Sequence, residues 1–84
     1  MNEERDELFA KLEASLMIAL NQFRYTLQDR TADFIGELIE NAEYGLASDI
    51  LLENLKLEQQ DKSLRGYAEL LSARGLMGLM PGNG

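Results

Sequence analysis

Apolar residues between positions 3 and 25 recur at intervals of three and four, the spacing that places side chains on one face of an α-helix. The members of this face are Leu8, Phe9, Leu12, Leu16, Ala19, Leu20 and Phe23. The first turns are acidic, which suits the end of a helix where its dipole favours negative charge; they contain Glu3, Glu4, Asp6 and Glu7. The pattern predicts one long helix over residues 3–25.

The reverse of this helix is less polar than the solvent side of a surface helix usually is. Its apolar members are Ala10, Ala14, Met17, Ile18 and Tyr25. Two interpretations fit this composition. Either the C-terminal tail or another helix covers this side in part, or the side is a contact surface for a partner or for a second copy of the chain.

A second helix is predicted over residues 31–41. Either Asp29 or Thr31 supplies its N-cap. Its inward residues are Ile35, Leu38 and Ile39, with Phe34 at the margin. The helix is expected to end at Asn41 and Ala42.

A third helix is predicted from Glu43 or Tyr44 to about Glu58. Its apolar residues cover about half of the helix circumference, a width typical of the central helix of a small bundle. These residues are Leu46, Ala47, Ile50, Leu51, Leu55 and Leu57.

A fourth helix follows a polar connection at residues 59–63, where Asp61 or Ser63 is the expected cap. Its inward residues are Leu64, Tyr67, Ala68 and Leu71. Gly75 is the expected helix stop. Residues 75–84 hold four glycines and the only proline, so they are predicted to form a largely irregular tail.

Composition supports an all-α fold in a single domain over residues 1–84. Leucine occurs 16 times and valine is absent, which favours helices over sheets. A chain of this length buries only roughly 60% of its unfolded surface, so it forms one small core. We therefore predict a bundle of about four helices.

Missing residue types exclude several kinds of chemistry. The chain has no cysteine and no histidine, which removes thiolate zinc sites, thiol nucleophiles and imidazole bases. The N-terminus is acidic, and the uncharged stretch from Ala14 to Phe23 is too short to span a bilayer. We expect a cytoplasmic protein that binds no cofactor, nucleic acid or membrane and is not an enzyme.

The formal charge of −7 is concentrated between residues 29 and 53, which hold seven acidic residues and a single arginine. The acidic residues are Asp29, Asp33, Glu37, Glu40, Glu43, Asp49 and Glu53. The first four fall within about 80° of arc on the predicted second helix.

Four interpretations of this charge are open. It is the solvated side of an amphipathic helix, or a surface that docks a cationic protein. A divalent-metal site at Glu37, Glu40 and Glu43 lacks a supporting loop or histidine. An enzyme that uses carboxylates alone lacks a nucleophile pattern, a phosphate loop and a cofactor motif.

Residues 34–55 read FIGELIENAEYGLASDILLENL and carry a family resemblance. The stretch resembles the MafI family and related contact-dependent growth inhibition immunity proteins of bacterial polymorphic toxin systems. The matching positions are Phe34, Ile35, Ile39, Glu43, Tyr44, Gly45, Leu46, Ala47, Leu51 and Leu55. The glycine-rich tail departs from the family pattern, in which a longer final helical segment is expected.

The resemblance implies an antitoxin that binds a cognate secreted toxin domain, often a basic nuclease and preferably an EndoU-like ribonuclease. The expected toxin-binding residues are Asp33, Glu37, Glu40, Glu43, Tyr44, Asp49 and Glu53. Tyr44 with Gly45 is either a turn and packing device or a toxin contact. The alternative function is an acidic helical adaptor or regulator without a toxin partner. One form of this alternative is a homodimer joined through the Ile18 and Tyr25 side of the first helix.

Overall fold

The computed structural model describes residues 3–55 and 65–78 and shows, within them, an all-α bundle. Its elements are α1 (Glu3–Phe23), the 3-10 helix η1 (Arg24–Thr26), α2 (Asp29–Glu40), α3 (Tyr44–Asn54) and α4 (Arg65–Leu76). The predicted fold class is therefore confirmed. Helix α3 ends at Asn54 with Leu55 in extended backbone, so the predicted end of the third helix near Glu58 is wrong. The segment 56–64, with the predicted connection at 59–63, its caps and Leu64, and tail residues 79–84 lie outside the described residues.

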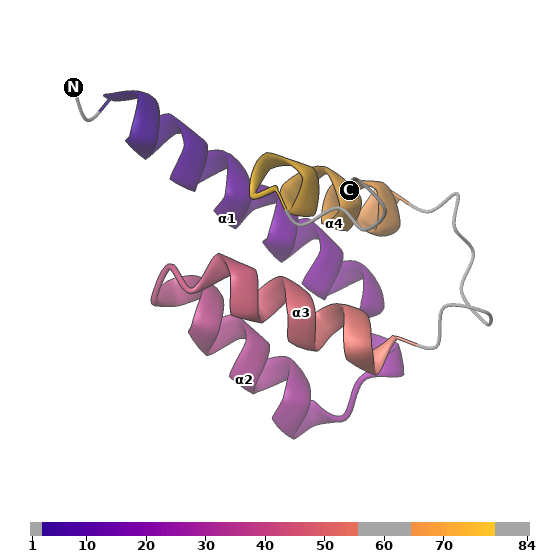
Figure 1. The fold of residues 1–84 in the computed structure, drawn as a ribbon. Coiled ribbons are helices and arrows are strands. Elements are labelled where there is room, and N and C mark those ends of the chain that lie inside the picture. The colour runs from indigo at the N-terminus through magenta and orange to yellow at the C-terminus, as the bar shows by residue number, and fades with distance from the viewer. Residues whose placement is uncertain (1–2, 56–64, 79–84) are drawn as a thin grey trace.

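The central helix of the bundle is α1, which contacts α2, α3 and α4 (Figure 1). Helices α2 and α3 form a hairpin on one side of α1, and α4 lies along α1 (Figure 1). Helix α3 also contacts α1, α2 and α4, as expected for a central helix, although α1 is longer and packs more extensively on the others. The wide apolar face of α3 is left partly open, and Leu46 is 48% exposed.

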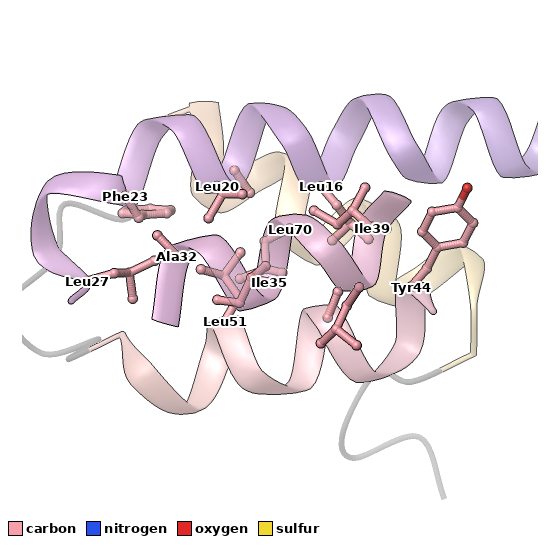
Figure 2. Close-up of a cluster of buried hydrophobic side chains, with 14 of the residues drawn as sticks. Leu16, Leu20, Phe23, Leu27, Ala32, Ile35, Ile39, Tyr44, Leu51 and Leu70 are labelled. Carbon is pink, nitrogen blue, oxygen red and sulfur yellow. The ribbon is translucent and has the colours of Figure 1, made fainter. Parts of the chain in front are cut away.

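The core joins the inward faces of all four helices (Figure 2). Its members include Leu12, Leu16, Leu20, Phe23, Leu27, Ala32, Ile35, Ile39, Ala47, Leu51 and Leu70. Complete burial of one leucine or isoleucine contributes about 1.5–3 kcal/mol, so these side chains dominate the stability of the bundle. The predicted inward face of α1 is confirmed from Leu12 to Phe23, whereas Phe9 is exposed at its margin.

The joint between α1 and α2 differs in detail from the prediction. Helix α1 ends at Phe23 and tightens into η1, where the Thr26 hydroxyl donates to the Phe23 carbonyl at 2.9 Å. Helix α2 begins at Asp29, two residues earlier than expected, after Gln28 in extended backbone. In this described segment no side chain caps the first turn, so the prediction of Asp29 or Thr31 as N-cap is wrong. Asp29 instead lies in the first turn, where the helix dipole favours it.

The turn between α2 and α3 is a Schellman motif. The Glu43 N–H donates to the Leu38 carbonyl at 2.8 Å, and the Ala42 N–H donates to the Ile39 carbonyl at 3.0 Å. Ala42 has a φ of 61°, a left-handed conformation that glycine usually adopts at this position. The predicted end of the second helix is confirmed, with Asn41 as C-cap.

Helix α4 runs through Gly75 to Leu76, so the prediction of Gly75 as helix stop is wrong. The chain leaves the helix at Gly78, whose φ is 73°. The predicted inward face is also partly wrong, because Ala68 is exposed while Gly66, Leu70 and Ala73 are buried. The buried side of α4 is lined by small residues because this helix lies very close to α1.

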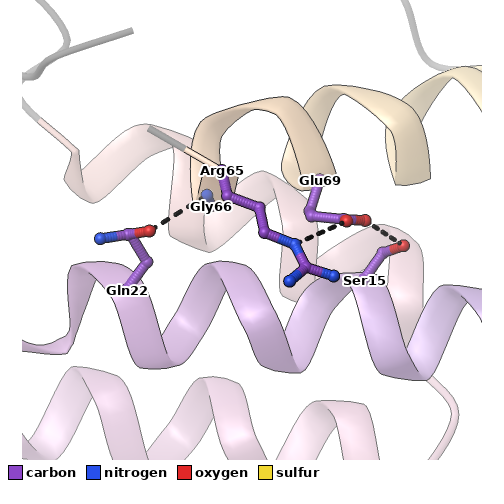
Figure 3. A network of polar contacts seen from close by, with 5 residues as sticks. All are labelled: Ser15, Gln22, Arg65, Gly66 and Glu69. Carbon is purple, nitrogen blue, oxygen red and sulfur yellow. Dashed lines mark hydrogen bonds and ion pairs between the residues drawn. The ribbon is translucent and has the colours of Figure 1, made fainter. Parts of the chain in front are cut away.

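A small polar network holds α4 on α1 (Figure 3). The Gly66 N–H in the first turn of α4 donates to the Gln22 amide oxygen at 3.3 Å, which satisfies a group that the helix leaves unpaired. The Ser15 hydroxyl donates to Glu69 at 2.9 Å. Helix α4 therefore covers one side of the predicted reverse face of α1.

The remainder of that reverse face is open. Ala10 and Ala14 are exposed, and Tyr25 is 94% exposed in η1. Met17 is half-buried and packs against the core. Cover by another helix is thus partial, and the interpretation as a contact surface stays open for the uncovered strip.

Candidate protein-binding surface

The solvent face of α2 carries Asp33, Glu37 and Glu40, and all three are exposed as the helical spacing predicted. The opposite face of the helix is buried through Ala32, Ile35, Leu38 and Ile39. This division follows from the period of the helix, since residues four apart lie one above the other. Like charges at this spacing weaken a helix by a few tenths of a kcal/mol per pair.

A groove of about 580 Å³ separates this face from α1, and we call it the acidic groove. Its floor includes Met17, Leu20 and Gly36, and its polar lining is Glu13, Arg24, Asp33, Glu37 and Glu40. Gly36 has no side chain, so nothing projects from this position into the groove. A Cβ added there would lie 3.8 Å from the Leu20 Cδ2 atom, which is ordinary contact.

Charge in the acidic groove is strongly unbalanced. Arg24 lies 3.8 Å from Asp33, and both side chains are substantially exposed, so this pair contributes at most about 1 kcal/mol. Within residues 3–55 and 65–78, the structure shows no ion pair for Glu13, Glu37 or Glu40. The groove therefore presents four carboxylates and one guanidinium, a net charge of −3.

Glu13 belongs to this surface although the sequence reasoning did not single it out. It comes from α1, and only the packing of α2 on that side of α1 brings it opposite Glu37 and Glu40. In the sequence, the one indication that Glu13 could belong to this surface is its position beside the predicted inward face of the first helix. That signal becomes useful only when the position of the second helix is known.

A second groove, of about 750 Å³, lies between α2 and α3, and we call it the Phe34 groove. It is lined by Arg30, Thr31, Asp33, Phe34, Glu37, Ile50 and Asn54. Phe34 is 45% exposed, and Ile50 is half-buried against the core. Asp33 and Glu37 line both grooves, so the α2 carboxylates form the ridge between them.

Tyr44 is placed in the core rather than on a binding surface. It is only 9% exposed, and its ring meets the Phe9 ring edge-on with centroids 5.7 Å apart. Burial raises the pKa of the Tyr44 hydroxyl above its ordinary value, and the negative charge of Glu13 raises it further. The position of Tyr44 at the start of α3 supports the packing interpretation (Figure 2).

Asp49 lies away from both grooves and is already paired. The Arg74 Nη1 atom of α4 lies 2.6 Å from the Asp49 carboxylate and also donates to the Ser48 hydroxyl at 2.9 Å. The Arg74 side chain is only 12% exposed. Asp49 thus ties α3 to α4, whereas Glu43 and Glu53 are exposed but line neither groove.

Of the seven predicted binding residues, the structure brings only Asp33, Glu37 and Glu40 to one surface. Among the described residues, no group of three or more acidic side chains lies close enough together to bind a metal ion. No helix in the same part of the chain has the length and apolar character needed to cross a bilayer. No protein-family model, curated protein or solved structure matches the chain.

Proposed function

We propose that this chain is a binding protein that docks a cationic protein through the acidic groove and the adjoining face of α2. The observation that carries the proposal is the groove lining itself, where Glu13 faces Asp33, Glu37 and Glu40 with a single arginine among them. Such a surface steers a basic partner into contact and selects against acidic ones.

Folding alone does not account for this arrangement. Carboxylates four residues apart repel one another, and an ordinary solvated face intersperses lysine or arginine to relieve that repulsion. Here three of the groove carboxylates lie on successive turns of α2 and a fourth lines the groove from α1. A partner that brings positive charge to the groove converts this repulsion into attraction.

The finer proposal is that the partner is a secreted toxin domain and that the chain is its immunity protein. Residues 34–55 support it through their resemblance to the MafI family, and the ridge Asp33 to Glu40 lies within or directly beside that stretch. A basic nuclease, with an EndoU-like ribonuclease favoured, binds nucleic acid through cationic groups. An acidic protein that occupies those groups blocks the enzyme without any catalysis of its own.

The proposal expects a secreted toxin gene directly upstream of this gene, and the test is inhibition of the C-terminal toxin domain that it encodes. Co-expression with that domain should protect cells, and the purified pair should show nuclease inhibition. The variant Glu13→Lys, Glu37→Lys and Glu40→Lys should lose both effects while its circular dichroism stays helical. The control Asp6→Lys, Glu7→Lys and Glu53→Lys makes the same change of charge at exposed residues outside the acidic groove. Full protection by the groove variant would contradict the proposal.

A second candidate function is an acidic adaptor that pairs with another copy of itself. It is favoured by the uncovered strip of α1, where Ala10 and Ala14 are exposed, and by Tyr25. Light scattering separates the two functions. A stable dimer that Tyr25→Ser dissociates, together with no binding to the neighbouring toxin domain, would favour the adaptor.

A further inference from the structure

The Phe34 groove has an apolar floor that electrostatic docking does not require. Phe34 comes from α2 and Ile50 from α3, and together they line a space of about 750 Å³. The Phe34 side chain is not a member of the core or of the residues packed against it. It is 45% exposed, so a large part of its ring is available for a contact from outside the fold.

A further exposed apolar side chain lies on α3, outside the lining of the groove. Leu46 lies one helical turn before Ile50, on the same side of α3, and is 48% exposed. Exposed apolar residues that lie together, bordered by polar ones, are typical of protein contacts. Large side chains at the centre of such contacts carry most of the binding energy.

The edge of the groove indicates the chemistry of its occupant. Asp33 and Glu37 line it along α2, one turn apart, and the same two carboxylates belong to the acidic groove. Arg30 lies one turn before Phe34, toward the start of α2. An occupant that fits must bring an apolar side chain to the floor and positive charge to Asp33 and Glu37.

We propose that the Phe34 groove receives one aliphatic or aromatic side chain of the cationic partner, flanked by lysine or arginine that pairs with Asp33 and Glu37. This inference rests on the proposed function, because both use the same partner and the same α2 carboxylates. The charges guide association, and the apolar side chain, removed from water between Phe34 and Ile50, slows dissociation.

The experiment uses the full chain and a defined probe. The probe is a short helical peptide with one leucine and a lysine one turn away on each side, followed by amide NMR titration. Binding should shift the resonances of residues 30–37 and 46–54. Replacing the peptide leucine by serine, or Phe34→Ser in the chain, should each weaken binding about tenfold.

Two variants serve as controls. Phe34→Leu keeps the floor apolar and should retain affinity within about threefold. That change in binding free energy is well below the loss expected when a dominant interface side chain is removed. Tyr25→Ser removes an exposed aromatic ring outside the groove and should leave binding unchanged. Because Phe34 is 45% exposed and lies outside the core, Phe34→Ser should lower the midpoint of thermal unfolding only modestly and leave the chain folded at the temperature of the titration.

The outcomes separate this inference from the proposed function. Equal affinity for the leucine and serine peptides, or no binding of the leucine peptide, overturns the proposal that the Phe34 groove receives an apolar side chain. Docking of the toxin domain at the acidic groove is then judged by its own assay. Resonance shifts confined to the open strip of α1 also overturn it. Unaltered binding of a peptide with glutamine in place of lysine contradicts the charge complementarity on which both proposals stand.

Discussion

Gly66 lets α4 approach α1 closely, and its replacement by alanine tests this contact. A Cβ added there would meet the Gln22 Cβ atom well inside contact distance, with the Gln22 Cγ at 2.6 Å and the Phe23 Cε2 at 3.2 Å. The Gln22 Cβ is attached directly to the backbone of α1, so no side-chain rotation relieves the clash. Helix α4 must move away from α1.

The expected loss in the free energy of unfolding can be estimated from these contacts. Forcing an extra carbon into a packed site costs about 1–3 kcal/mol. Displacement of α4 also breaks the bond from the Gly66 N–H to Gln22, which contributes about 0.5–1.5 kcal/mol. Alanine returns up to about 1 kcal/mol through its higher helix propensity. The balance is a loss of about 2 kcal/mol, against a total stability of about 4–13 kcal/mol for a chain of 84 residues.

Gly36 provides the matched control, because it is also a glycine inside a helix. Its added Cβ meets only the Leu20 Cδ2 atom, at 3.8 Å, so Gly36→Ala should gain up to about 1 kcal/mol from helix propensity alone. Urea unfolding followed by circular dichroism measures both variants. If Gly66→Ala proved as stable as Gly36→Ala, the close approach of α4 to α1 would be refuted.

Three further predictions concern the turn, the α3–α4 contact and the buried tyrosine. Ala42→Gly should raise the free energy of unfolding by about 0.5–1 kcal/mol, because it relieves a left-handed alanine, and a denaturant midpoint that falls would contradict this. Arg74→Met should lower that free energy by about 1–3 kcal/mol through loss of its bonds to Ser48 and Asp49, as measured by urea unfolding. Because the pKa of Tyr44 is raised in the folded state, the folded chain holds its proton longer than the unfolded chain, so stability should fall as pH rises past the ordinary tyrosine pKa of 10.0. Tyr44→Phe should reduce that alkaline loss, and an unchanged profile would contradict it.

The fold was predictable from the sequence where large apolar residues mark the inward face. Leu12, Leu16 and Leu20 recur at helical spacing, and all three are buried. Helix α4 was harder, because Gly66 and Ala73 occupy its buried side and small residues give little hydrophobic signal. They are buried because α4 packs closely against α1, and the spacing of residues within α4 does not reveal that packing.

The candidate site divides in the same way. The spacing of Asp33, Glu37 and Glu40 was enough to place them on one exposed face, since all three belong to one helix. Glu13 was missed because it joins them only across the contact between two helices. Asp49 was assigned to the binding surface although Arg74, 25 residues further along the chain, neutralises it in the fold.

The central claim, that the acidic groove docks a cationic partner, is tested most directly by calorimetric titration of this chain with the neighbouring toxin domain. We predict that Glu13→Lys, Glu37→Lys and Glu40→Lys together weaken binding at least about 100-fold, as expected when several charge pairs at an interface are reversed. The control Asp6→Lys, Glu7→Lys and Glu53→Lys should stay within about tenfold of the parent chain, since charges outside the contact act mainly through long-range steering. Equal losses in the two variants, or none in the first, would contradict the claim.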